Sequence, residues 1–164
     1  MRRKILISIL FLLPALLFSQ TAAELGALLE TETVNMETAS RFILGAAELL
    51  PPQLYGADAT AAAYDMAVSK GWTKKAPAQD ATLRDISFLI MNAFDFKGGI
   101  FYTLFKNPRY AYREMLYHRL IQGRADPSFT VSGQRLLNII GRSLSHWGEN
   151  ELMEELARQG GGAK

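Results

Sequence analysis

The sequence predicts an all-α fold in which three helix–loop–helix repeats pack around a shared core. Two observations support this prediction: a capped, amphipathic helical pattern recurs three times, and a second helix precedes each copy. The length of 164 residues, with 49% apolar and 21% charged residues, fits one domain with a single core. We expect this domain over residues 22–158, with repeats at about 22–50, 57–96 and 107–145 and a short terminal helix, followed by a flexible tail over 159–164.

Residues 1–21 have the pattern of a secretory signal peptide. Arg2, Arg3 and Lys4 precede an uncharged run over 5–18, which is shorter than the roughly 20 residues that span a bilayer. Small and polar residues follow, so we expect cleavage within a few residues of position 21. An uncleaved N-terminal anchor is the alternative. The protein is therefore expected to be exported, periplasmic or envelope-associated, with no stable transmembrane segment after cleavage.

The recurring pattern opens at Asn35, Thr82 and Ser132, three residues that suit a helix N-cap. Apolar residues follow four, seven and eight positions later, which is the stripe of a helix with one buried face. These stripe positions are Ala39, Phe42, Ile43, Ile86, Leu89, Ile90, Leu136, Ile139 and Ile140. The spacings between copies are in the range of known helical repeats. A chance similarity of three ordinary capped helices is the alternative interpretation.

A helix is also expected before the capped helix of each of the first two copies. In the first copy the helix covers residues 22–30. In the middle copy Asp58 or Thr60 is expected to cap a helix that ends at Lys70, with Gly71 in the stop position.

In the third copy, Asn107 is the expected N-cap and Pro108 lies at the first helical turn, where proline is favoured. This helix is predicted to reach about Leu120, with Gly123 as its stop. The apolar segment over 100–105 lies just before it. That segment either tucks beneath the third copy or forms an exposed interaction surface.

The order of helix, glycine, polar loop and capped helix resembles the surface-layer homology (SLH) repeat, which commonly occurs in threes. The third copy carries the closest match. Gly123, Asp126 and Phe129 reproduce the Gly-x-x-Asp-x-x-Phe loop of that family, and Ser132 opens the helix that follows. The chain also resembles exported repeat proteins of spirochaete-type bacteria, which look like divergent forms of this module.

The middle copy supplies the other residues of the resemblance. Pro77 matches the loop proline, and Thr82 and Asp85 stand where the family motif Thr-Arg-Ala-Glu has its threonine and its acid. The motif arginine is replaced in the three copies by Met36, Leu83 and Gly133. The resemblance implies a three-pronged helical fold and binding of cell-wall glycan.

Basic residues and tyrosines are concentrated in the third copy. Residues 97–142 carry a net charge of +6, whereas residues 21–96 carry −5. Arginine offers forked donors to carboxylates and phosphates, and tyrosine offers a flat face to sugars. The predicted ligand-binding residues, four of which share one arc of a helix, are Arg109, Tyr110, Arg113, Tyr117 and Arg124. A solvated basic face with packed tyrosines is the alternative.

The chain offers little for catalysis. It has no cysteine, and His118 and His146 have no third ligand at metal-binding spacing. We therefore expect no enzymatic activity, no cofactor and no metal. The expected function is that of an exported, non-catalytic module that binds an envelope polymer or anionic glycan, with no nucleic-acid partner. The alternative is an adaptor that binds another envelope protein, which the missing motif arginines favour.

Overall fold

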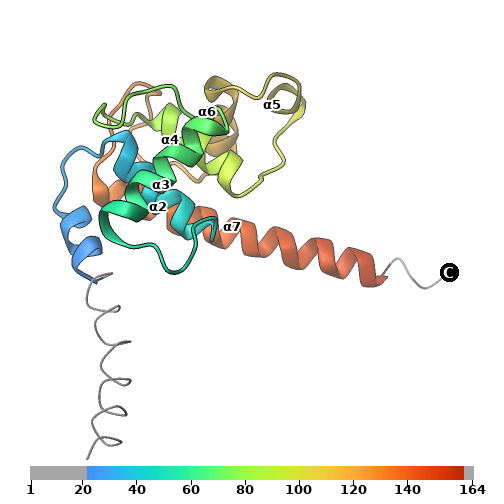
Figure 1. Ribbon diagram of the computed structural model, residues 1–164. Helices are drawn as coiled ribbons and strands as arrows, with labels where there is room; N and C mark the ends of the chain where they lie inside the picture. The colour runs from blue at the N-terminus through green and yellow to red at the C-terminus, as the bar shows by residue number, and fades with distance from the viewer. Residues whose placement is uncertain (1–21, 161–164) are drawn as a thin grey trace, which may run out of the picture.

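The computed structural model describes residues 22–160, and the predicted signal peptide and the last four residues lie outside this range. The all-α prediction is confirmed: within the described range the only strand-like pairings are two isolated bridges, Asn35 with Asp80 and Thr82 with Thr130. After a helical segment over 22–29, the chain forms α2 (Met36–Ala46), α3 (Gly56–Ser69), α4 (Leu83–Ala93), α5 (Ile100–Phe105), α6 (Pro108–Tyr117) and α7 (Gly133–Gly160) (Figure 1).

The three predicted capped helices are α2, α4 and the start of α7. Asn35 accepts a hydrogen bond from the Thr38 N–H at 2.8 Å, Thr82 and Asp85 form a capping box, and Ser132 Oγ accepts from the Arg135 N–H at 3.3 Å. Every predicted stripe residue is buried except Phe42, which packs against the core while partly exposed. The amphipathic pattern therefore identified the inner faces of these helices correctly.

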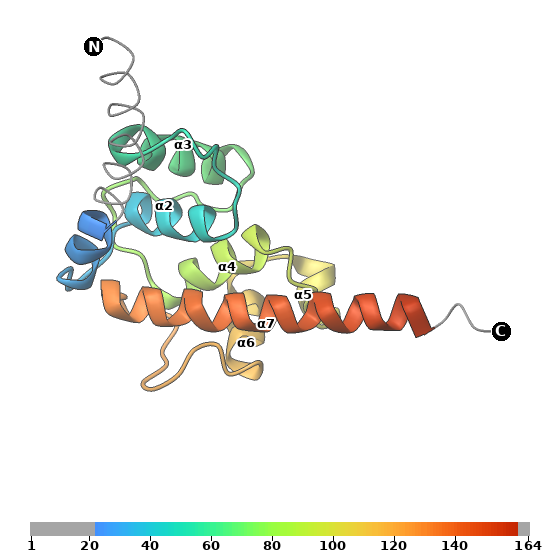
Figure 2. The same cartoon turned by 90° about the horizontal axis from the view of Figure 1, so that it is seen from below.

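Each capped helix packs against the helix that begins the next copy. α2 packs on α3, and α4 packs on α6. α7 in turn meets the segment over 22–29, where a Cβ atom on Gly133 would lie 1.7 Å from the carbonyl oxygen of Leu28. The helices thus form three pairs in cyclic order, and Figure 2 shows α2, α4 and α7 side by side through the centre of the molecule.

Backbone hydrogen bonds join the three pairs at a central hub. The Met36 N–H donates to Gln79 O and the Leu83 N–H donates to Phe129 O, each at 2.9 Å. The Gly133 N–H closes the ring by donating to Thr31 O, also at 2.9 Å. Because the first N–H groups of a helix lack partners within it, loops from other copies satisfy them here. This cyclic order is what three related repeats would produce, and their relationship stays a prediction.

The start of α3 differs from the prediction. Neither Asp58 nor Thr60 caps it, because α3 begins at Gly56. The Gly56 N–H, which has no acceptor within its own helix, donates to Oε1 of Glu24 at 3.1 Å. A carboxylate from the segment over 22–29 thus takes the place of a local cap. The predicted end is confirmed, since α3 stops at Ser69 and Gly71 adopts a positive φ of 70°.

The helix α6 starts as predicted and ends early. Asn107 accepts from the backbone N–H groups of Arg109 and Tyr110. The helix ends at Tyr117, because Arg119 takes a left-handed conformation at φ 57° and turns Leu120 back into the core. The prediction of an end near Leu120 is therefore wrong. Gly123, the predicted stop, lies in a later bend with a positive φ of 78°.

The predicted separate terminal helix is instead a continuation of α7, a single helix of 28 residues. α7 runs on past the other helices (Figure 2) and still includes residues 159 and 160, which were predicted to belong to the tail. Among the described helices, none combines the length and the apolar character needed to cross a membrane.

Candidate functional site

A polar cleft of about 320 Å³ lies between the first turns of α7 and the turn over 122–124. Its lining contains three arginines, three side-chain amides and, among the described residues, no carboxylate. The lining residues are Gln122, Gly123, Arg124, Ser132, Gln134, Arg135, Asn138, Ile139 and Arg142. Clustered guanidinium groups without acidic neighbours suit a ligand that bears carboxylate or phosphate groups.

The helical spacing of α7 brings its polar residues to the cleft. Arg135, Asn138 and Arg142 recur every three or four positions, so they share one face of the helix beside the buried Leu136. Arg142 Nη1 donates to the carbonyl oxygen of Asn138 at 3.3 Å. Each guanidinium carries five N–H donors, so this contact leaves most of the Arg142 donors for other partners.

Arg135 and Arg124 shape the outer wall of the cleft. Arg135 Nη2 donates to the backbone carbonyl groups of Gln122 and Arg124, which ties the turn to α7. The Arg124 guanidinium lies 5.9 Å from the centre of the Phe129 ring, a cation–π distance. Arg135 is thus mainly a structural clamp, whereas Arg124 is exposed and rests on an aromatic face.

The loop behind the cleft is held by Asp126, whose Oδ1 accepts from both the backbone N–H and the hydroxyl of Ser128. These hydrogen bonds lower the pKa of Asp126, since they stabilise the carboxylate. Tyr112 is buried close by, and its hydroxyl has no hydrogen-bond partner. Burial raises the pKa of Tyr112, and the Asp126 carboxylate raises it further, while Arg135 lowers it.

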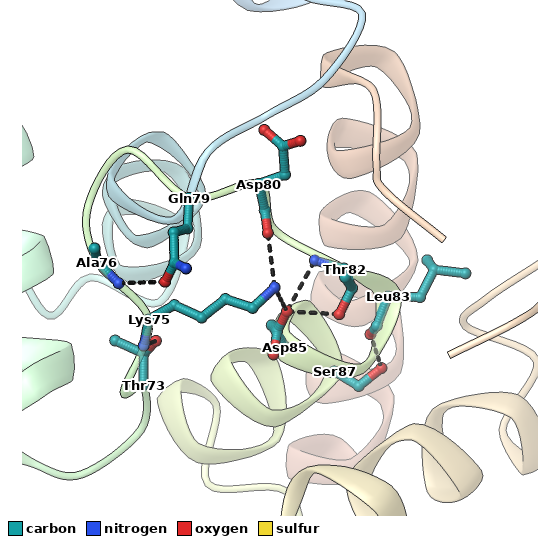
Figure 3. A network of polar contacts seen from close by, with 9 residues as sticks. All are labelled: Thr73, Lys75, Ala76, Gln79, Asp80, Thr82, Leu83, Asp85 and Ser87. Carbon is teal, nitrogen blue, oxygen red and sulfur yellow. Dashed lines mark hydrogen bonds and ion pairs between the residues drawn. The ribbon is translucent and has the colours of Figure 1, made fainter. Parts of the chain in front are cut away.

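The matching loop of the middle copy is closed by an ion pair (Figure 3). Lys75 Nζ lies 2.7 Å from Asp85 Oδ2 and also donates to the carbonyl oxygen of Asp80. The Asp85 carboxylate accepts from the Thr82 N–H at 2.9 Å. Pro77 contributes its carbonyl oxygen, which accepts from the Glu37 N–H. Thr82, Asp85 and Pro77 therefore stabilise the loop and the helix start.

The structure separates the predicted binding residues into two places. Arg124 lines the cleft, but the four residues on α6 do not. Arg109 and Arg113 are exposed, and Tyr117 is 80% exposed with its ring edge-on to His118. Tyr110 is half-buried, and its ring stacks with Phe101 and Phe105 at centroid distances of 5.8 and 5.7 Å. That stacking occupies the aromatic face that a sugar would need.

A second cleft of about 300 Å³ lies between the segment over 22–29, α2 and the start of α3. Its basic residue is already paired, because Arg41 Nη2 lies 3.4 Å from Glu24 Oε2. The first cleft is therefore better suited to an anion than the second.

Of the ligand-binding residues predicted from the sequence, Arg124 lines this cleft, and the prediction does not include the polar residues of α7. The basic and aromatic cluster of α6 is the stronger pattern in the sequence, and Arg135, Asn138 and Arg142 lie outside it. Their spacing along the predicted helix, next to the apolar stripe, is the signal that could have found them.

The described part of the chain holds no group of three or more histidine, cysteine, aspartate or glutamate residues placed to bind a metal ion. No protein-family model, no curated protein and no solved structure matches this chain. The resemblance to the SLH repeat therefore stays a prediction from the sequence.

Proposed function

We propose that the protein is an exported, non-catalytic envelope module that binds an anionic glycan or envelope polymer in the cleft beside α7. The observation that carries the proposal is the cleft lining, which combines Arg124, Arg135 and Arg142 with amide side chains and contains no carboxylate among the described residues. Guanidinium groups bind carboxylate and phosphate groups with two parallel hydrogen bonds, and amides bind sugar hydroxyls.

The cyclic arrangement of the three helix pairs supports the same proposal. It agrees with the three-pronged fold that the SLH resemblance implies. The position of the missing motif arginine in the third copy is Gly133, which lies directly against the Leu28 carbonyl group and leaves no room for a side chain. Arg135, two positions later, and Arg142 on the same helix face would supply the positive charge instead.

The experiment is a pull-down of the full chain with purified cell-wall glycan that bears carboxylate or phosphate groups, compared with the same glycan after these groups are removed. The test variant replaces Arg124 and Arg142 with glutamine and leaves the clamp residue Arg135 in place. Two charge-assisted contacts of roughly 1.5–3 kcal/mol each predict a loss of affinity of at least about a hundredfold.

The matched control replaces two exposed arginines outside the cleft, Arg84 and Arg119, with glutamine. We expect this control to bind like the parent chain. Equal binding by the cleft variant and the control, or no enrichment of the anionic glycan over the neutral one, would show that the cleft is not the glycan site.

One observation favours the alternative function, an adaptor for another envelope protein. α7 runs on past the other helices (Figure 2). Leu144, Trp147 and Leu152 on this helix are exposed, although the Trp147 ring also packs edge-on against Phe94 of the core. A projecting helix with exposed apolar residues suits packing against a helix of a partner. Cross-linking in envelope extract, with and without Trp147→Ser and Leu152→Ser, tests it, because a specific protein partner should be lost in the double variant.

A further inference from the structure

The short helix α5 exposes an unusual amount of apolar surface. Ile100 is 77% exposed, Leu104 is 69% exposed, and Phe101 and Phe105 are each 59% exposed. At 100° per residue these four side chains cover an arc of about 140° on one side of the helix. Four large apolar residues exposed within six positions form a contiguous patch, and such patches mark interaction sites.

The opposite side of α5 anchors it to the domain. Tyr102 is 3% exposed, and burial, assisted by the nearby carboxylates of Asp95 and Glu114, raises its pKa to about 12. A Cβ atom on Gly98 would lie 2.5 Å from the Tyr102 ring, so the glycine allows the ring to pack on the backbone. The buried Tyr102 therefore fixes the orientation of α5, with the apolar side of the helix facing outward.

An aromatic layer supports the patch from α6. Phe101 and Phe105 both stack with Tyr110, at angles of 14° and 26° between the ring planes. Their outer surfaces remain exposed even so. Figure 1 shows α5 at the edge of the molecule, away from the central helices, so the patch is carried on a projecting part of the fold.

Positive charge borders the apolar patch. Lys106 is the C-cap residue of α5, and Arg109 and Arg113 follow one turn apart on α6, next to Tyr110; all three are exposed. Asp95 and Glu114 are the carboxylates near the buried Tyr102 side of α5, and Glu114 lies close to Gly99. The surface of an anionic membrane has charged head groups outside and hydrocarbon beneath them. An apolar protrusion can enter the hydrocarbon while the basic residues around it contact the head groups.

We propose that α5 docks the protein on a membrane surface that contains anionic lipid. Ile100, Phe101, Leu104 and Phe105 enter the boundary between head groups and acyl chains. Lys106, Arg109 and Arg113 contact the anionic head groups. A helix of six residues cannot cross the bilayer, so the contact is peripheral. This surface is distinct from the cleft beside α7, and either one can bind without the other.

The chain has no cysteine, so a fluorophore attached to a single introduced cysteine reports the environment of that position alone. The experiment attaches an environment-sensitive fluorophore at Leu104→Cys in the full chain and adds vesicles of phosphatidylglycerol and phosphatidylcholine, or of phosphatidylcholine alone. We expect a blue shift with the anionic vesicles only, and its loss at high salt. Because residues 5–18 are also apolar, total vesicle binding would not locate the contact.

The matched control carries the fluorophore at Val68→Cys, an exposed apolar position on α3. We expect no shift there. Adding Ile100→Ser to the labelled chain should lower the apparent affinity for anionic vesicles by about tenfold or more, whereas Val68→Ser should leave it unchanged. Circular dichroism confirms that each variant keeps its helices.

Three results would overturn the proposal. They are no shift at position 104, equal shifts at positions 104 and 68, and an affinity that Ile100→Ser does not change. If Ile100→Ser instead lowers the mass of the protein in solution, the patch is a contact between copies of this chain, and the membrane assignment is wrong.

Discussion

Lys75 Nζ lies 2.7 Å from Asp85 Oδ2, so one carboxylate both caps α4 and holds the loop in front of it. The backbone of Lys75 is fixed as well, because its carbonyl oxygen accepts from the Tyr64 hydroxyl on α3 at 2.7 Å. The pair therefore links three parts of the fold: α3, the loop and α4. Both side chains are partly buried, at 32% and 17% exposed for Lys75 and Asp85, so solvent screens the pair less than a surface pair.

Asp85→Ala is expected to lower the free energy of unfolding by about 1–2 kcal/mol, because it removes a helix cap and one partner of the ion pair. Urea unfolding followed by circular dichroism measures the change. Asp65→Ala, at an exposed position on α3, is the control and should change stability by less than about 0.5 kcal/mol. Similar values for the two variants would mean that the Lys75–Asp85 pair contributes nothing beyond an ordinary surface charge.

Gly133→Ala is expected to cost at least about 3 kcal/mol of stability, because overpacking against backbone is hard to relieve. The new Cβ atom would lie 1.7 Å from the Leu28 carbonyl oxygen, and the Gly133 N–H bond to Thr31 would be strained at the same place. Thermal unfolding measures the loss, and limited proteolysis tests whether the segment over 22–29 detaches.

Gly141→Ala is the control on the same helix, since nothing lies within 4 Å of the Cβ position there. It should be neutral or stabilise the protein by up to about 1 kcal/mol, because alanine is the better helix former. If Gly133→Ala behaves like Gly141→Ala, the close approach between α7 and the first helical segment is absent in solution.

The helices were predictable because their signals are local. The stripe that follows each of Asn35, Thr82 and Ser132 needs only residues within one helix, and the structure buries every stripe residue except the partly exposed Phe42. The start of α3 was not predictable in this way, since its acceptor is Glu24, 32 positions earlier in the chain. The local cap rule predicts Asp58 or Thr60, but a distant carboxylate already accepts from the backbone N–H of Gly56.

The candidate site was predicted less well, also for a physical reason. Arg109, Tyr110 and Arg113 form the stronger pattern in the sequence, but the packing of α5 covers the Tyr110 ring. The cleft forms where the turn at Arg124 folds back onto α7. Hydrogen bonds from Arg135 Nη2 to the carbonyl oxygens of Gln122 and Arg124 hold the turn in that position. Contacts between separate segments such as these leave no periodic trace in the sequence.

His146→Gln should change how stability depends on pH. The ring centroid of His146 lies 4.7 Å from that of His118, and burial, then the charge of His118, lower the pKa of His146 below its ordinary value of 6.5, while Glu149 opposes the shift. As pH falls through 6.5, the unfolded chain takes up this proton before the folded chain does, so stability is lost. Above 6.5 the group has little effect.

The measurement is the free energy of unfolding of the parent chain and of His146→Gln at about pH 7.5 and about pH 5.5. The part of the acid destabilisation that comes from His146 should disappear in the variant. His118→Gln should remove part of it too, because the charge of His118 contributes to the shift. The same pH dependence in all three proteins would count against a lowered pKa at His146.

Charge reversal of Arg109 and Arg113 to glutamate separates the two proposed surfaces. Both residues are exposed and neither lines the cleft, so stability should change by no more than about 0.5 kcal/mol and glycan binding should be retained. The α5 contact with anionic vesicles should weaken, since each basic residue near such a surface contributes about 1 kcal/mol and the reversal adds repulsion. Leu136→Ala, in the core, checks that the stability assay responds, because it should cost about 2–5 kcal/mol. Loss of glycan binding in a folded Arg109→Glu, Arg113→Glu chain would instead place the glycan site on α6, as the sequence alone predicts, and would remove the cleft from the proposed function.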